Sequence, residues 1–134
     1  MIPIAYNLQD EQRDLLIIVL KNELQPNAEK GARYTLTTSF QGTILRMKKG
    51  MFPSYDSADQ KDFMATTQFS PTHARRAFPC FDEPELKATF SITLGRGKEF
   101  GTVSNTQVAY EKSRGGDLYW DFFEAKYIND LIYR

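Results

Sequence analysis

Several segments of the chain alternate apolar and polar side chains, which is the pattern of a half-buried β-strand. The clearest runs over residues 87–94, where Ala88, Phe90, Ile92 and Leu94 share one face. The same alternation predicts strands at 33–45, 62–69 and 117–123, with shorter ones at 100–104 and 107–111. The uninterrupted apolar run at 15–20 predicts a buried strand. Most of the chain is therefore expected to be extended.

Turn-forming residues separate these segments. They lie at 25–27, 49–50, 95–97 and 114–116. Only residues 72–77 resemble a helix, which Thr72 could cap and which Pro79 would end. Many short strands joined by polar turns are typical of an antiparallel β-sandwich. We therefore predict an all-β fold, with residues 1–134 as a single domain.

Composition is that of an ordinary globular chain. Of the 134 residues, 41% are hydrophobic and 25% are charged, and the 17 basic and 17 acidic residues leave no net charge. This balance gives no electrostatic reason to expect nucleic acid or an anionic membrane as a partner. The longest apolar run is far shorter than the roughly 20 residues of a membrane span, and no signal peptide is visible.

The residues that could carry catalysis are few. Cys80 is the only cysteine, so it is expected to be a small buried apolar residue; acting as a nucleophile would require His73, the only histidine. One histidine and one cysteine cannot assemble a histidine-rich zinc site. His73 is expected to be solvated or to cap a turn. The glycines at 95–101 do not have the spacing of a phosphate loop and are better explained by a β-hairpin turn.

Asp82 and Glu83 are adjacent, so on an extended backbone their side chains point to opposite faces. They therefore make a poor acid–base pair. A structural role is more consistent with the sequence, in which one of them accepts hydrogen bonds from Arg75 or Arg76 and fixes the loop.

Residues 67–84 carry the most specific pattern of the chain. They read Thr-Gln-Phe-Ser-Pro-Thr-His-Ala-Arg-Arg-Ala-Phe-Pro-Cys-Phe-Asp-Glu-Pro, and Lys-Ala-Thr-Phe follows at 87–90. This block resembles the signature of the N-terminal β-domain of M1-family zinc aminopeptidases. Weaker similarity covers most of 15–124. The resemblance implies a β-sandwich, in agreement with the alternation.

In that family this domain packs against a catalytic domain and contributes a wall of the substrate cleft. The resemblance implies that Gln68 helps to hold the N-terminal end of a peptide, together with the side chain two positions on, Ser70. Residues i and i+2 of a strand share a face, so both could reach one ligand. Serine lacks the charge of the family's glutamate, which would cost roughly 1.5–3 kcal/mol of binding. The alternative for Gln68 is a strand residue that simply faces solvent.

The family's catalytic strings, Gly-x-Met-Glu-Asn and His-Glu-x-x-His, do not occur in this sequence. No residue is therefore assigned to catalysis or to metal binding, and no cofactor is expected in this chain. Zinc belongs to the catalytic region of the full-length family. There it activates water.

We therefore expect a truncated, substrate-cleft-wall domain of an M1-type aminopeptidase that is inactive alone, with a sandwich that is incomplete at both ends. The alternative is a stand-alone β-sandwich module that binds peptide N-termini or a partner aminopeptidase. A degenerate product without function is a third possibility. The chain would be cytoplasmic if Met1 is the true start, and extracellular or membrane-associated if it is part of an ectoenzyme.

Overall fold

The computed structural model describes residues 2–24, 33–44, 46–55, 63–83 and 85–128. The described strands are β1 (Ile4–Asp10), β2 (Leu15–Leu20), β3 (Gly50–Tyr55), β4 (Phe63–Gln68), β5 (Ala88–Phe90), β6 (Thr93–Gly97), β7 (Val108–Gly115), β8 (Leu118–Phe123) and β9 (Lys126–Ile128). One short 3₁₀ helix, η1 (Ala74–Arg76), follows β4. The strands pair as β1–β2, β3–β4, β5–β9 and β6–β8–β7, always antiparallel. The predicted all-β antiparallel class is confirmed.

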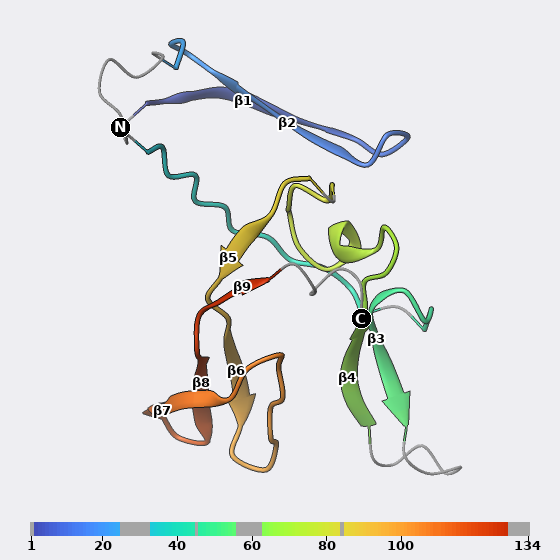
Figure 1. Ribbon diagram of the computed structural model, residues 1–134, viewed down its shortest axis with the longest axis vertical. Coiled ribbons are helices and arrows are strands. Elements are labelled where there is room, and N and C mark those ends of the chain that lie inside the picture. Colours follow the sequence, from blue (N-terminus) through green and yellow to red (C-terminus); the bar gives the residue numbers. More distant parts are fainter. Residues whose placement is uncertain (1, 25–32, 45, 56–62, 84, 129–134) are drawn as a thin grey trace.

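The hairpin of β1 and β2 forms a ribbon at one end of the molecule (Figure 1). Its tight turn is held by Asp10, whose carboxylate accepts hydrogen bonds from the backbone N–H of Arg13 at 3.0 Å and from Nε of Arg13 at 2.7 Å. Asp14 adopts a φ of 53°, a left-handed conformation that aspartate tolerates better than most residues. The predicted strand at 15–20 is present as β2. The prediction that it is buried is wrong in part, because its first three residues are exposed.

The hairpin of β3 and β4 lies at the opposite end and leads into η1 (Figure 1). Its register places Gly50 opposite Gln68 and Tyr55 opposite Phe63. The predicted strand at 62–69 is confirmed as β4, while residue 62 lies outside the described residues. The predicted helical turn is confirmed in shortened form as η1. It begins after His73 rather than at Thr72.

The largest sheet has β8 at its centre, between β6 and β7. The predicted strand at 117–123 is therefore paired on both sides and is not an exposed edge. The turn predicted at 114–116 is present one to two residues later, at 116–117, because Arg114 and Gly115 are the last residues of β7. Gly115 and Gly116 have φ values of 98° and 57°, which an L-residue adopts only with strain. The short strand predicted at 107–111 is present as the longer β7.

The strand predicted at 87–94 is two strands in the structure. β5 ends at Phe90 and pairs with β9, and the chain then resumes as β6 in a different sheet. Between them the carbonyl oxygen of Ile92 accepts a hydrogen bond from the N–H of Phe123 at 3.0 Å. An alternating pattern reveals a face but not the partner, so the change of sheet was invisible in the sequence.

Three other expectations from the pattern are wrong. Residues 95–97 belong to β6 rather than to a turn, and the turn follows at Lys98 and Glu99. Residues 33–44 run as an extended segment without sheet pairing, between the β1–β2 ribbon and the β3–β4 hairpin (Figure 1). Residues 100–104 form no strand. Alternation is present in residues 33–44 and 100–104, but these residues pair with none of the described strands. The turn predicted at 25–27 lies outside the described residues.

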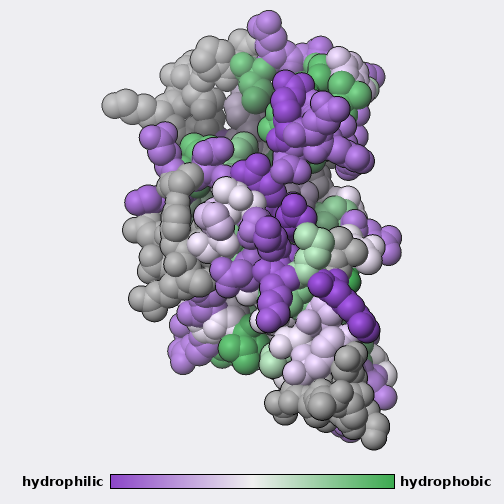
Figure 2. Space-filling model, turned by 90° about the vertical axis from the view of Figure 1, so that its right-hand side faces the viewer, coloured by the Kyte–Doolittle hydropathy of each residue, from purple (hydrophilic) through white to green (hydrophobic). Residues whose placement is uncertain are grey.

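Little apolar surface is buried. Among the described residues, the buried apolar side chains are Ala74 and Phe123, at 1% and 6% exposure. The molecule exposes 11493 Å², whereas a compact monomer of 15.4 kDa exposes about 7,200 Å². Figure 2 shows apolar (green) surface between the polar side chains, including patches at the height of the β1–β2 ribbon. The described part of the chain therefore forms separate small sheets rather than one continuous core.

Candidate functional site

The sequence placed its candidate substrate-binding residues where β4 ends. Gln68 is the last residue of this strand, and its side chain is exposed. Ser70 is half-buried in the following turn, and the Ser70–Pro71 peptide bond is cis. Because the strand stops at Gln68, its pleat does not extend to Ser70. The Nε2 atom of Gln68 donates instead to the carbonyl oxygen of Ser70 at 3.5 Å. The two residues are therefore in contact through the side chain of Gln68 and the backbone of Ser70, and not through both side chains.

Behind this turn, the loop from 69 to 83 is closed by an ion pair. Nε of Arg75 donates to Oδ2 of Asp82 at 2.7 Å, and the backbone N–H of Arg75 reaches the same oxygen at 3.4 Å. The Asp82 side chain is 4% exposed, and its hydrogen bond to Arg75 raises the pKa of the guanidinium. The predicted bond between this arginine and an acidic residue of the signature is confirmed. The other carboxylate oxygen, Oδ1 of Asp82, is buried without a partner among the described residues.

Aromatic packing joins this loop to the neighbouring strand β5. Phe78 makes edge-to-face contacts with Phe69 at 5.8 Å and with Phe90 at 6.3 Å between ring centroids. Cys80 lies half-buried in the same loop, and burial raises the pKa of its thiol, as expected for an apolar rather than a nucleophilic cysteine. His73 precedes η1, but its side chain makes no capping hydrogen bond.

Gly50 allows β3 to approach η1. Its φ is 72°, and a Cβ atom built at this position would lie 2.7 Å from Cβ of Arg76 and 3.4 Å from the carbonyl oxygen of His73. No other residue fits this position without movement of the backbone or of Arg76. Since Gly50 pairs with Gln68 in the β3–β4 register, the same glycine brings the end of β4 against the loop.

A polar cluster in the β6–β8–β7 sheet was not found from the sequence. Asp121 is 3% exposed, and it accepts hydrogen bonds from Nε of Arg96 at 2.6 Å and from Oγ1 of Thr102 at 2.5 Å. Arg96 also pairs with Glu111 and lies 5.4 Å over the ring of Tyr119. Hydrogen bonds from Arg96 and then Thr102 hold the pKa of Asp121 below its usual 3.8. Thr102 and Arg96 lie 19 and 25 positions before Asp121 in the sequence, so no local pattern could reveal the cluster.

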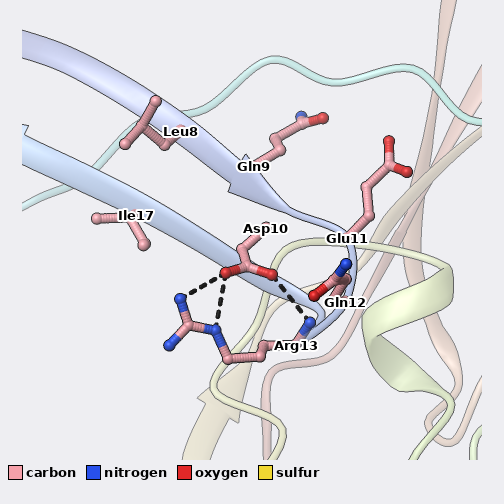
Figure 3. A pocket seen from close by; sticks show the side chains of 7 residues that line it. All are labelled: Leu8, Gln9, Asp10, Glu11, Gln12, Arg13 and Ile17. Carbon is pink, nitrogen blue, oxygen red and sulfur yellow. Dashed lines mark hydrogen bonds and ion pairs between the residues drawn. The ribbon is translucent and has the colours of Figure 1, made fainter.

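A shallow hollow lies at the tip of the β1–β2 hairpin, where Leu8 and Ile17 stand beside the Asp10–Arg13 pair (Figure 3). Neither Gln68 nor Ser70 lines it. The two candidate residues of the sequence lie instead where β4 ends.

Zinc is the metal of the family that the sequence resembles. A protein zinc site takes several histidine, cysteine or carboxylate ligands. In the ranges that the structure describes, no three or more such side chains come together in a group that could hold a metal ion. The described residues therefore do not fit a zinc ion.

The described strands are all antiparallel, and an ion-paired loop connects β4 to β5. The sequence model of the Peptidase M1 N-terminal domain matches residues 1–128. The chain therefore belongs to the Peptidase M1 N-terminal domain family.

Three relatives illustrate the match. The chain is 42% identical to aminopeptidase M1-A of Oryza sativa subsp. japonica over 103 residues, 76% of this chain and 11% of that protein. It is 42% identical to aminopeptidase N of Bos taurus over 93 residues, 69% of the chain and 9% of the relative. It is 36% identical to human glutamyl aminopeptidase over 104 residues, 77% of the chain and 11% of the relative. The chain thus spans about a tenth of the length of these aminopeptidases.

No helix among the described residues is long and apolar enough to cross a membrane.

Proposed function

We propose that residues 1–134 form one domain that serves as the N-terminal, non-catalytic part of an M1-type aminopeptidase. In this role the domain contributes a wall of the cleft that holds the N-terminus of a peptide substrate. A catalytic domain supplies the zinc ion and the reacting groups. Family membership and the share of the relatives' length that the chain covers support this proposal.

The observation that carries the proposal is the position of Gln68. Its amide is exposed where β4 ends and the ion-paired loop begins, and an amide can both donate to and accept from a peptide end. The 3.5 Å bond to the Ser70 carbonyl oxygen is long, so a ligand can replace it at little cost. The carbonyl oxygen of Ser70 is then a second acceptor for an α-ammonium group.

Peptide titration tests this role. We expect the chain to bind a peptide with a free N-terminus more tightly than its N-acetylated form, as measured by calorimetry. Gln68→Ala should abolish the preference, while Gln41→Ala, which changes an exposed glutamine of the extended segment, should not. Equal binding of both peptides, or no effect of Gln68→Ala, would contradict the proposal.

Ser70 provides a gain-of-binding version of the same test. Ser70→Glu adds a carboxylate beside the proposed ammonium position, and a charge-assisted hydrogen bond contributes about 1.5–3 kcal/mol, or roughly tenfold or more in affinity. The gain should be confined to the free-amine peptide. Ser70→Gln, which has the same length without the charge, is the matched control and should give a smaller gain.

Catalysis is assigned to another domain, so the purified chain with added zinc should not hydrolyse an aminoacyl chromogenic substrate. Zinc-dependent hydrolysis that co-purifies with the chain and is lost in Gln68→Ala would overturn that assignment.

A further inference from the structure

Basic side chains from two segments of the chain meet beside the end of β4. Lys48 and Lys49 directly precede Gly50, the first residue of β3, and both are exposed. Arg76, the last residue of η1, is also exposed, and its Cβ atom lies 2.7 Å from the Cβ position built at Gly50. The contact between β3 and η1 therefore brings three cations together from distant parts of the sequence (Figure 1). We call Lys48, Lys49 and Arg76 the basic patch.

The basic patch lies on the Gln68 side of the β3–β4 hairpin. Gly50 is the direct partner of Gln68 in the register, and opposed residues of an antiparallel pair share a face. The Cβ position at Gly50 points at Cβ of Arg76, so the side chain of Arg76 starts on the face to which Gln68 belongs. Opposed Cα atoms are about 4.5–5.5 Å apart. The long stems of arginine and lysine can therefore reach a ligand that is held at Gln68.

The charge of the basic patch is not compensated by any ion pair that the structure describes. The loop residues 69–76 include two arginines and a histidine but no aspartate or glutamate. Asp82, the buried carboxylate of the same loop, pairs with Arg75 at 2.7 Å, and no described ion pair includes a residue of the basic patch. Cations that are held near one another repel, so the patch favours an anionic ligand.

We infer that the basic patch binds an acidic side chain within the first three residues of the peptide whose N-terminus Gln68 holds. The inference rests on the proposed function and adds a class of substrate to it. Residues of an extended peptide are about 3.3 Å apart, so the first three side chains span the distance from Gln68 to the patch. A nucleic-acid surface neutralises many phosphates, and three cations in a chain without net charge do not make one.

Calorimetric titration of the full chain tests this selectivity. Peptides with a free N-terminus carry glutamate at the first, second or third position, and each is compared with its glutamine counterpart. The best glutamate peptide should bind roughly three- to tenfold more tightly, because each ion pair at an exposed site contributes little. At about 1 M salt the gain should disappear, since screening then acts within a few ångströms.

Charge reversal in the basic patch should remove the selectivity. Combined Lys48→Glu and Lys49→Glu should abolish the gain for glutamate peptides, and exposed substitutions of this kind change stability little. Combined Lys21→Glu and Lys112→Glu is the matched control, because it changes the net charge equally at exposed lysines outside the patch. No gain at any of the three positions, or equal losses in the two double variants, would overturn the inference.

Arg76 allows a test that keeps the contact between η1 and β3. Arg76→Gln retains the Cβ atom beside Gly50 but removes the charge, so it should reduce the gain for glutamate peptides. Arg76→Lys retains the charge and should restore most of that gain. A loss of gain that is equal in both variants would show that the charge of this residue does not contribute.

N-acetylated versions of the same peptides separate this inference from the proposed function. If the chain prefers free N-termini but binds glutamate and glutamine peptides equally, the inference fails and the proposed function stands. If acetylated and free peptides bind equally while the glutamate gain persists and requires Lys48 and Lys49, the proposed function fails and the acidic selectivity stands.

Discussion

The β1–β2 ribbon and the β6–β8–β7 sheet are built from similar local patterns but reach different degrees of burial. In the sheet, β8 is paired on both sides, Phe123 is 6% exposed, and a buried carboxylate is satisfied by groups from distant positions. In the ribbon, each strand has one partner, and the apolar face of Leu8 and Ile17 remains 53% and 37% exposed.

The difference shows that forming a strand and burying it are separate steps. A hairpin needs only a turn and complementary neighbours in sequence. A core needs a third strand or a second layer, together with partners for every buried polar group. In the sheet, Arg96 and Thr102 are hydrogen-bond partners of the buried Asp121, whereas the ion pair of the ribbon, between Asp10 and Arg13, lies at its solvent-exposed tip.

Truncating one apolar side chain in each region should give the largest difference in stability between the sheet and the ribbon. Phe123→Ala removes a buried ring and should lower the free energy of unfolding by about 3–5 kcal/mol. Leu8→Ala, at 53% exposure, should change it by no more than about 0.5 kcal/mol. Urea titration followed by Trp120 fluorescence measures both changes. Equal effects would mean that the two regions form one core.

Gly50 offers a test of the contact between β3 and η1, which is intermediate in size. Gly50→Ala combines a φ of 72° with a Cβ position 2.7 Å from Cβ of Arg76, so it should cost about 1–3 kcal/mol of stability. Gly42→Ala is the control, because nothing lies within 4 Å of a Cβ at that position. Limited proteolysis of the loop at 69–83 reports the change. Equal cleavage of the two variants would exclude a role of Gly50 in positioning the loop.

Acid should destabilise the sheet more than the ribbon, and this effect is expected to be smaller than those of Phe123→Ala and Gly50→Ala. Hydrogen bonds from Arg96 hold the pKa of Asp121 below 3.8, so its ionised form is favoured in the folded state. This stabilisation is complete above pH 3.8 and is lost as the pH falls through the lower folded pKa. Hydrogen exchange of β8 should therefore increase in acid, and Asp121→Asn should flatten that dependence.

Asp10 is the control for the acid effect in the ribbon. Its pKa is also lowered, mainly by the side-chain hydrogen bond from Arg13, but the arginine is exposed to solvent. Solvent screening weakens such a pair. Asp10→Asn should consequently leave the pH dependence of β8 unchanged, and a flattened profile in that variant would show that acid acts on the whole molecule.

The signature loop was the most predictable part of the molecule. A bond from Arg75 or Arg76 to one of the two acidic residues could be inferred from the sequence because their separation is short, and the structure shows that Arg75 and Asp82 form it. The contact between Gln68 and Ser70 was harder to predict from the sequence. It depends on where β4 ends, and element boundaries are the least certain feature of a pattern. Their roles toward a peptide stay predictions.

By itself, the sequence determined the all-β class, the family, the positions of β4 and β8, and a bond between an arginine and an acidic residue in the loop, without deciding which pair forms it. These depend on alternation, turn residues and contacts within a few positions, which a linear pattern contains. Only the tertiary structure decided that residues 87–94 divide between two sheets, that Asp121 is enclosed by distant partners, and that Leu8 and Ile17 of the ribbon stay exposed. Burial depends on which neighbours arrive from elsewhere in the chain, because an apolar side chain marks a face without naming its partner.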